Sequence, residues 1–557
     1  MASGRFPVRG RSWRRLLVIA SALAAGAPIL PHPAAAVPSV AAPDAVASDA
    51  AAPDAVASDA VTSDDRGYGE VVTGSVRVRA ADGVPLAARV HRPARPGPHP
   101  LVVMPGAWFH APPDAVVLDR RLRALAASGY VVVGYDPRGL RRSGGHVDLA
   151  GPADVADASR VIDWALAHTP ADPARVGMLA ASYGAGVSLN TAAFDPRVRA
   201  VAALSGWADF ADGYVRNGTR AAPMGTYQEL IGRIDGRFGP GTEAALAALR
   251  RGGDTPAAWA AQRSPRTHVA RLNERRTAVL MVNEWDDPLV PAGQTGVFLD
   301  SLRGPRQLRM YPGGHGDSNS LTSDLSGGPG VWEHAVRWMD RHVRGTAPRS
   351  PAEPPVVLQT RTGGAPEHYP SWSALRRASR SVPLTPAGGG TRVSLTAGLP
   401  SAAESGAFPV AGSADRAGVR QGTLLPLLSA PASAVATSAP LTGRQALRGA
   451  PVVTTRLTPT APDGTVIGYL YDVDPLGRAR LLTHAPYSFS GRAGTGPFEV
   501  RIPMPATAWD VPAGHRLAVV LDTVDHRYAS DNPIGGRLGV DVSATRLVAP
   551  LFPRPGG

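Results

Sequence analysis

The stretch RVGMLAASYGAGVSLN, residues 175–190, decides the fold of this chain. An apolar run ends at Ser182, and small residues then lead into helix-forming sequence. This order is typical of a nucleophile elbow, in which a strand enters a sharp turn with a serine at its tip and a helix begins at once. The turn requires minimal side chains two residues before and two after the serine. These residues are Ala180 and Gly184, and Ala180 differs by one methyl group from the usual glycine.

The chain around the elbow alternates between strand and helix patterns. Continuous apolar runs, each typical of a strand buried on both faces, occur at 101–104, 130–135, 176–181, 200–204 and 278–283. Helical patterns at 120–128 and 155–168 lie between them, and a hairpin with an Asp82-Gly83 turn precedes them. Strands that alternate with helices form parallel βαβ units, so we expect an α/β domain at 67–346 whose sheet is covered on both faces.

Residues 207–273 separate two of these strands and are long enough for an inserted subdomain. Their segments rich in Ala, Leu and Arg have a helical pattern that is interrupted by glycines. An insertion at this place lies over the carboxyl ends of the strands, where open α/β sheets bind ligands. The sequence therefore predicts a helical cap.

The composition changes after Arg344. Prolines mark a linker at 347–370, and the remaining residues, 371–557, are rich in Thr, Val, Gly and Pro. Short β-like runs with turn signals recur at 451–457, 466–472, 480–483, 498–502 and 517–521. This pattern predicts an all-β domain, either a sandwich or a jelly roll.

The first 36 residues have the layout of a secretory signal peptide, with arginines before a short apolar run and small residues at its end. The run is short for a membrane-spanning helix, which needs ~20 residues. We expect a secreted protein without stable membrane insertion, with a retained anchor as the alternative and with Sec or twin-arginine export both open. The decapeptide AAPDAVASDA then occurs twice, at 41–50 and 51–60. It contains no aromatic residue, so we expect a disordered spacer over 37–66.

Composition excludes several classes of function. A chain of 557 residues is too long for one core, and its 44% hydrophobic content is that of a globular protein. The net charge is +13, but the basic residues are arginines scattered along the chain, so no nucleic-acid partner is predicted. The absence of cysteine excludes disulfides, thiolate metal sites and cysteine nucleophiles. Nothing in the sequence implies a metal or a cofactor.

A serine nucleophile needs a base to take its proton and an acid to orient that base. After an elbow of this kind the acid and then the histidine follow the serine along the chain. The strand at 278–283 leads into Asp286-Asp287-Pro288, and a β-like piece at 306–311 leads into a loop in which glycines flank His315. We therefore predict Ser182, Asp287 and His315 as a catalytic triad, with Asp286 as the alternative acid.

A tetrahedral intermediate also needs an oxyanion hole with two donors. One donor should be the backbone N–H of Tyr183, the residue after the nucleophile. The second should come from the loop after the strand at 101–104. We expect the N–H of Ala107 there, with that of Trp108 as the alternative.

With these residues placed, the chain resembles the cocaine-esterase and X-prolyl dipeptidyl aminopeptidase-like family of serine hydrolases. The resemblance covers 70–557 and is carried by DGVPLAARVHRP, GYVVVGYDPRGLRRSGG, RVGMLAASYG, the Asp287 and His315 loops, and LRGAPVVTTRLTPTAPDGTVIGYLYDVDPLGRARLLT. It implies a capped α/β-hydrolase domain followed by a jelly roll, and hydrolysis of amides or esters through an acyl-enzyme. Many members have a tyrosine in the first loop that supports the oxyanion. This chain has Pro105-Gly106-Ala107-Trp108 there.

We expect an exported dipeptidyl peptidase that releases X-Pro dipeptides, because the resemblance includes such enzymes. The first alternative is an esterase or amidase for small acyl substrates. The second alternative is a surface- or carbohydrate-binding protein with a degenerate hydrolase domain, which the intact Ser182, Asp287 and His315 set argues against. A dipeptidyl peptidase also needs a carboxylate for the free amine of its substrate. Candidates in the cap are Asp209, Asp212, Glu229, Asp235 and Glu243.

Overall fold

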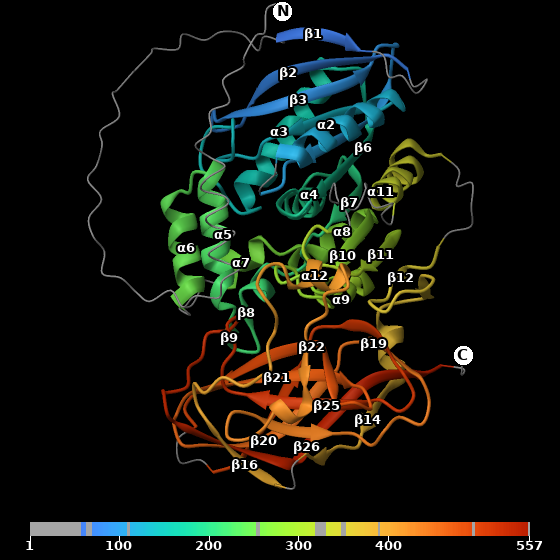
Figure 1. Ribbon diagram of the computed structural model, residues 1–557. Coiled ribbons are helices and arrows are strands. Elements are labelled where there is room, and N and C mark those ends of the chain that lie inside the picture. The colour runs from blue at the N-terminus through green and yellow to red at the C-terminus, as the bar shows by residue number, and fades with distance from the viewer. Residues whose placement is uncertain are drawn as a thin grey trace, which may run out of the picture.

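One eleven-stranded sheet organises the first half of the chain (Figure 1), in the order β1-β2-β3-β5-β4-β6-β7-β10-β11-β12-β13. Its main strands are β2 (Val71–Arg79), β3 (Pro85–Pro93), β4 (His99–Pro105), β5 (Val131–Tyr135), β6 (Ala171–Ala181), β7 (Val198–Leu204), β10 (Ala278–Glu284) and β11 (Arg306–Tyr311). From β5 to β12 in this sheet order, neighbouring strands run parallel. Strand β3 pairs antiparallel with both β2 and β5. The sheet therefore has the parallel centre that the sequence predicts.

The computed structural model describes residues 57–62, 69–108, 112–251, 257–317, 330–346, 353–387, 390–492 and 496–554. The predicted signal peptide, 1–36, lies outside these residues. Within them, no helix is both long enough and apolar enough to cross a membrane.

Alternate residues of each central strand point into two different cores, as expected for a sheet covered on both faces. In β4, Leu101 and Val103 join the core under α3 (Pro152–His168) and α4 (Tyr183–Phe194). Their neighbours Val102 and Met104 join the core under α2 (Pro112–Ala127) and α11 (Val331–Met339). All of β4 is buried, which explains why its sequence is a continuous apolar run.

The spacer prediction needs correction over six residues. Ala57–Thr62 form strand β1, which pairs antiparallel with β2 at the edge of the sheet. The rest of the predicted spacer, 37–56 and 63–66, lies outside the described residues. A segment with few apolar side chains buries little surface by itself. An open sheet edge supplies backbone hydrogen bonds to any extended segment, whatever its side chains.

The predicted linker at 347–370 is also wrong over part of its length. Strand β12 (Val356–Leu358) pairs parallel with β11, and β13 (Glu367–Tyr369) pairs antiparallel with β12. Prolines at 354 and 355 obscured the three apolar residues that follow them, all of which are buried. The sheet of the first domain thus continues into the segment that leads to the second.

The insertion after β7 folds mainly as helices, as predicted for a cap. Its elements are the short hairpin β8 (Val215–Arg216) and β9 (Thr219–Arg220), followed by α5 (Ala222–Asp235), α6 (Pro240–Arg251), α7 (Ala257–Gln262) and α8 (Val269–Arg275). Helix α5 carries Met224 and Gln228 towards the end of the sheet at which β6 meets α4. The cap therefore lies over the elbow.

The C-terminal half is a sandwich of two antiparallel sheets around a separate core. One sheet runs β23-β20-β26-β19-β24 and the other β15-β18-β25-β21-β22-β17. Their shorter strands are β15 (Thr385–Pro386), β17 (Gly422–Leu424), β18 (Ala434–Thr437), β19 (Gln445–Gly449), β23 (Phe498–Pro503) and β24 (Thr507–Val511). The longest strands are β20 (Val452–Pro459), β21 (Gly464–Val473), β22 (Arg478–Phe489), β25 (Arg516–Asp522) and β26 (Arg537–Pro553). An α/β-hydrolase domain followed by an all-β domain is the predicted fold class.

Hydrogen bonds connect the cap hairpin, formed by β8 and β9, to the sandwich. At its tip, the amide of Asn217 donates to the carbonyls of Pro486 and Pro503, at 3.0 and 3.1 Å. The carbonyl of Asn217 accepts from the N–H of Ser488 at 3.1 Å. Figure 1 shows β8 and β9 reaching down to the sandwich. These hydrogen bonds therefore connect the cap directly to the sandwich.

Candidate active site

Ser182 stands between β6 and α4 in a backbone conformation that ordinary residues avoid. Its φ is 53° and its ψ is −118°, and its N–H donates to the carbonyl of Leu204 at 2.8 Å. A non-glycine residue with such angles stores ~1–3 kcal/mol of strain, which the surrounding structure must hold. The strained turn lifts the hydroxyl out of the sheet, as expected of a nucleophile elbow.

Close packing around the turn explains its small residues. A Cβ added to Gly184 would lie 2.1 Å from the carbonyl oxygen of Pro105, on the neighbouring strand β4. A Cβ on Gly186 would lie 2.3 Å from the ring of Trp207. Ala180, by contrast, is accommodated and buried at the end of β6. The departure from the usual glycine pattern therefore falls where a methyl group fits.

The three predicted triad residues meet at this point. The Nε2 atom of His315 lies 2.8 Å from Oγ of Ser182, and its Nδ1 atom lies 2.7 Å from Oδ2 of Asp287. The histidine follows β11 and the aspartate follows β10, so both loops emerge at the carboxyl end of the sheet, near the elbow. Hydrogen bonds of this length connect all three side chains in the order that serine hydrolysis requires.

Asp287 is held by its own loop. Its Oδ1 atom accepts hydrogen bonds from the N–H groups of Leu289 and Val290, at 2.7 and 2.9 Å. The other carboxylate oxygen is thereby aimed at His315. The side chain is fully buried, so water does not compete for it. This arrangement fixes the ring orientation of the histidine.

The pKa of His315 lies above its usual value of about 6.5. Burial by itself would lower it, but the charge and the hydrogen bond of Asp287 outweigh burial, and Glu284 and Asp317 add to their effect. The raised pKa means that the site stabilises the imidazolium that forms when the base takes the serine proton.

Asp286, the alternative acid, faces another partner. Its Oδ2 atom lies 3.1 Å from Nε of Arg361, which also donates to Asp415 at 3.1 Å. Burial raises the pKa of Asp286 to about 6, against the opposing effect of Arg361. Adjacent residues of one loop thus have different partners, His315 for Asp287 and Arg361 for Asp286.

The loop after β4 lies beside the elbow and contributes to the cavity there. Trp108 lines the cavity at Ser182, whereas Ala107 does not. The indole N–H of Trp108 donates to the carbonyl of Gln228 at 3.2 Å and so ties this loop to α5. Tyr183 is the first residue of α4, and the N–H groups of a first helical turn have no intrahelical partner. The N–H of Tyr183 therefore remains the expected oxyanion donor.

The cavity in front of Ser182 measures about 480 Å³, counted out to its open mouth. Besides Ser182, Tyr183 and His315, its lining residues are Trp108, Leu149, Trp207, Phe210, Tyr214, Met224, Gln228, Leu289 and Val290. Among the described residues that line it, none is an aspartate or glutamate. The cavity is therefore shaped for an uncharged, largely apolar group.

The cap carboxylates considered for amine binding lie elsewhere. Asp209 pairs with Arg266 at 2.8 Å, and Glu229 and Glu243 both contact Arg233. Asp212 lines a different cavity, and Asp235 does not line the cavity at Ser182. None of the five candidates therefore reaches the cavity in front of the nucleophile.

Sequence reasoning missed a buried partner of the elbow. The hydroxyl of Tyr183 donates to Oδ2 of Asp154 at 2.5 Å, and burial raises the pKa of Asp154 to about 7. The N–H of Ala150 also donates to this carboxylate, at 2.9 Å. An aspartate in the first turn of α3 looks like an ordinary helix start, since acidic residues are favoured there. Only the fold brings it beneath Tyr183.

Fold and site together define a serine hydrolase of the α/β-hydrolase fold with an appended β-sandwich. Residues 82–317 match the model of the X-Pro dipeptidyl-peptidase (S15) family, and residues 350–551 match that of the X-Pro dipeptidyl-peptidase C-terminal non-catalytic domain. The chain belongs to this family, which confirms the resemblance drawn from its sequence.

Known proteins similar to the chain agree with this assignment. A Streptomyces avermitilis protein, provisionally assigned as an Xaa-Pro dipeptidyl-peptidase, is 25% identical over 382 residues, which cover 62% of this chain and 52% of the relative. The match thus spans about half the length of that relative. An α-amino acid ester hydrolase has a similar structure, with a TM-score of 0.65 at 17% identity over 88% of this chain and 98% of its own. A CocE/NonD family hydrolase from Staphylococcus aureus has a TM-score of 0.65 at 13% identity, over 88% and 95%. At such identities the two structures support the fold alone.

Proposed function

We propose that this protein hydrolyses esters of small, uncharged, apolar acids through an acyl-enzyme on Ser182. The observation that carries the proposal is the cavity beside the serine, which aromatic and aliphatic side chains line and to which the described residues contribute no acidic side chain. Apolar surface favours an apolar acyl group, by ~25 cal/mol per Å² removed from water. Uncharged substrates need no counter-charge there.

The reaction follows from the hydrogen bonds already described. His315 takes the hydroxyl proton of Ser182 through Nε2 as Oγ attacks the carbonyl carbon, and Asp287 stabilises the resulting imidazolium. The N–H of Tyr183 and one N–H of the loop at 105–108 stabilise the oxyanion. His315 then protonates the leaving alcohol, and water hydrolyses the acyl-enzyme by the same steps in reverse order.

A second candidate is favoured by family membership. The S15 family model bears the name of X-Pro dipeptidyl-peptidases, so release of X-Pro dipeptides is the alternative activity. Such an enzyme must hold the free amine of its substrate, and a desolvated ammonium is costly unless a carboxylate pairs with it. The arrangement of the cap carboxylates favours the ester substrate.

We also propose that the protein is exported. The proposal rests on the basic start, the apolar run and the small residues within 1–36. Mass spectrometry of the mature N-terminus from the native host's culture medium tests it. A protein that stays in the cell with an intact N-terminus would contradict export.

One comparison of substrates separates the two activities. We would measure kcat/KM for p-nitrophenyl propionate, butyrate and benzoate beside Gly-Pro and Ala-Pro p-nitroanilides and their N-acetylated forms. The proposal expects turnover of the esters and little cleavage of the free-amine anilides. Efficient cleavage of those anilides, with a large loss on acetylation, would instead establish the dipeptidyl peptidase.

A matched control ties the measured turnover to this site. Ser182→Ala should abolish ester hydrolysis and labelling by a fluorophosphonate probe. A wild-type protein that neither reacts with the probe nor turns over any substrate would support a binding function without catalysis.

A further inference from the structure

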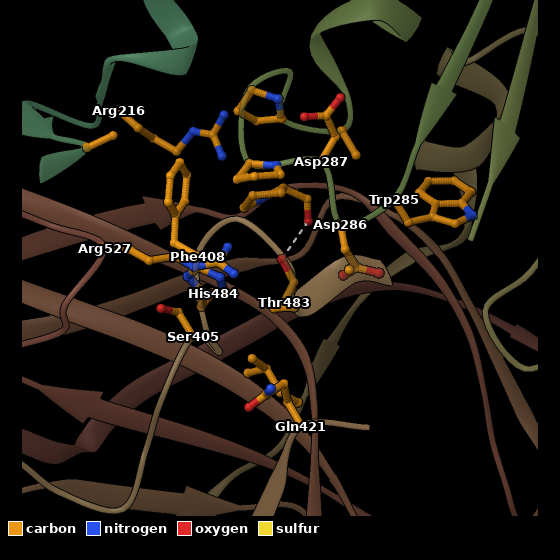
Figure 2. Close-up of a pocket in the computed structure, with 18 of the residues that line it drawn as sticks. Arg216, Trp285, Asp286, Asp287, Ser405, Phe408, Gln421, Thr483, His484 and Arg527 are labelled. Carbon is orange, nitrogen blue, oxygen red and sulfur yellow. Dashed lines mark hydrogen bonds between the residues drawn. The ribbon is translucent and has the colours of Figure 1, made fainter. Parts of the chain in front are cut away.

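A second and larger cavity lies between the acid loop, the cap and the sandwich, and Figure 2 shows its lining side chains. It measures about 950 Å³, counted out to its open mouth. Neither Ser182 nor His315 lines it, whereas Asp286 and Asp287 of the acid loop do. Met224 lines both cavities. The acid loop is therefore a wall between this space and the nucleophile.

The carboxylates at this cavity already have partners. Asp287 is bonded to His315, and Arg361 lies 3.1 Å from both Asp286 and Asp415. The same guanidinium donates through Nη1 to a backbone carbonyl at 2.6 Å. Each of these acidic groups therefore has a partner without any ligand, although Asp286 and Asp415 share the single guanidinium of Arg361.

The remaining acidic group, Asp212, pairs with Arg216 at 3.0 Å and also accepts from the amide of Gln294 at 3.2 Å. Arg216 makes this contact through Nη2 alone and lines the cavity. The rest of its guanidinium group is therefore not used by Asp212.

Arg527 has no carboxylate at ion-pair distance among the described residues, and burial lowers the pKa of its guanidinium against the opposing charges of Asp525 and Asp286. It is 9% exposed, lines the cavity, and donates through Nε to the carbonyl of Gly406 at 3.1 Å. Across the described parts of the chain, its two terminal nitrogens have no hydrogen-bond or ion-pair partner. Asp525, two residues away, uses its carboxylate for Ser405, for Tyr469 and for the backbone N–H of Arg527. A buried guanidinium left in this state is costly, and an anion would relieve the cost.

The groups around Arg527 suit a carboxylate with an apolar body. His484 bonds through Nδ1 to the hydroxyl of Tyr528 at 2.9 Å. Burial and the charge of Arg527 hold the pKa of His484 far below its usual range, so the ring is neutral and can use its second nitrogen for a ligand. Phe408, Met224 and several alanines and prolines supply the apolar lining. In Figure 2, Arg527 and His484 lie together below Phe408, and Asp286 stands on the other side of the space.

We propose that this cavity binds a small organic monocarboxylate, whose carboxylate pairs with the terminal nitrogens of Arg527 and whose apolar body contacts Phe408. A planar guanidinium with two free nitrogens matches the two oxygens of a carboxylate. The binding site is distinct from the cavity at Ser182, and the proposal does not depend on the chemistry at that serine.

The test is a comparison of acids with their neutral amides. Calorimetry with the full chain should detect benzoate, phenylacetate and 4-phenylbutyrate, and each corresponding primary amide should bind at least tenfold more weakly. Arg527→Gln should abolish this preference for the acid. Arg501→Gln removes an exposed arginine from strand β23 of the same sandwich, and it should leave binding unchanged. Ser182→Ala should also bind the acids as the wild type does.

Thermal unfolding checks that Arg527 is not simply a structural residue. Without ligand, Arg527→Gln should unfold no lower than wild type, because an unmatched buried charge is removed. Saturating benzoate should raise the Tm of the wild type but not that of the variant. The proposal is overturned if acids and amides bind equally, if no acid binds at ~10 mM, or if Arg527→Gln keeps the preference.

Inhibition kinetics then identify the source of the ligand. Competitive inhibition of ester hydrolysis by the acids, lost in Arg527→Gln, would mean that the cavity receives part of the substrate or product. Binding without competition would mean a separate effector. Either pattern supports the site.

Discussion

Asp286 and Asp287 are neighbours in the chain, yet their carboxylates have different partners on different elements. Asp287 lies 2.7 Å from His315 beside the nucleophile, whereas Asp286 lies 3.1 Å from Arg361 beside the second cavity. The backbone N–H groups of Leu289 and Val290 turn Asp287 towards the histidine. One loop therefore orients the base and also forms a wall of the second cavity.

The two aspartates should respond very differently to the same change. Asp287→Asn should lower kcat by roughly 10⁴-fold, because an amide no longer stabilises the imidazolium or fixes the ring tautomer. Asp286→Asn should cost at most about tenfold, since Arg361 retains Asp415. Steady-state kinetics on one ester decide between them. If Asp286→Asn proved the more damaging, the acid would have been assigned one residue too late.

The nucleophile can be tested for both activity and strain. Ser182→Ala and Ser182→Gly should each lose at least ~10³-fold in kcat, because the attacking oxygen is gone. Ser182→Gly should be the more stable of the two by about 1 kcal/mol, since glycine adopts a φ of 53° without strain. Chemical denaturation measures the difference. Equal stability of the two variants would argue against a strained elbow.

The pH dependence of kcat/KM should report His315. The base works only when neutral, and the charge of Asp287 raises its pKa, so activity should rise with pH on a limb centred above ~6.5. On the residual activity of Asp287→Asn, the limb should move to lower pH because the stabilising carboxylate is gone. A limb that stays in place in this variant would show that another group is titrating.

Gly184→Ala should damage folding as well as activity. Its Cβ would meet the carbonyl oxygen of Pro105 at 2.1 Å, and neither backbone can move without disturbing the sheet. We expect a loss of about 3 kcal/mol or more, or no soluble protein. Gly241→Ala is the matched control, because nothing lies within 4 Å of the added methyl group at the start of α6. Two variants of similar stability would contradict this account of the tight turn.

The side chain of Asn217 should stabilise the contact between the cap hairpin and the sandwich. Asn217 has a φ of 48° and bonds through its side chain to Pro486 and Pro503, so Asn217→Gly keeps the backbone freedom and removes only those bonds. Losing them should cost about 1–3 kcal/mol, because two part-buried acceptors lose their donor. If the hairpin positions the cap, KM should rise more than kcat falls. Asn217→Ala should be less stable still, since alanine resists this φ.

The central strands and the residues of the triad were predictable because their signals are local. Buried parallel strands appear as continuous apolar runs, and the three residues follow strands in a fixed chain order. Arg361 and Arg527 gave no such signal. The contacts of Arg361 are with Asp286 and Asp415, 75 and 54 residues away, and the place of Arg527 at the second cavity depends on how the sandwich meets the acid loop and the cap. Strand β12 was missed because its pairing depends on the open edge of β11 rather than on its own short sequence.

The contacts of Asn217 with β22 and β23 mean that the cap hairpin and the sandwich position each other. A chimaera that takes its sandwich from a relative keeps these bonds only where β22 and β23 follow the same backbone path, even if both halves fold. Exchanging β8 and β9 together with the sandwich preserves the match. Relatives in which β22 and β23 follow this path should therefore keep a donor side chain at residue 217, although more than 250 positions separate it from residues 486 and 503.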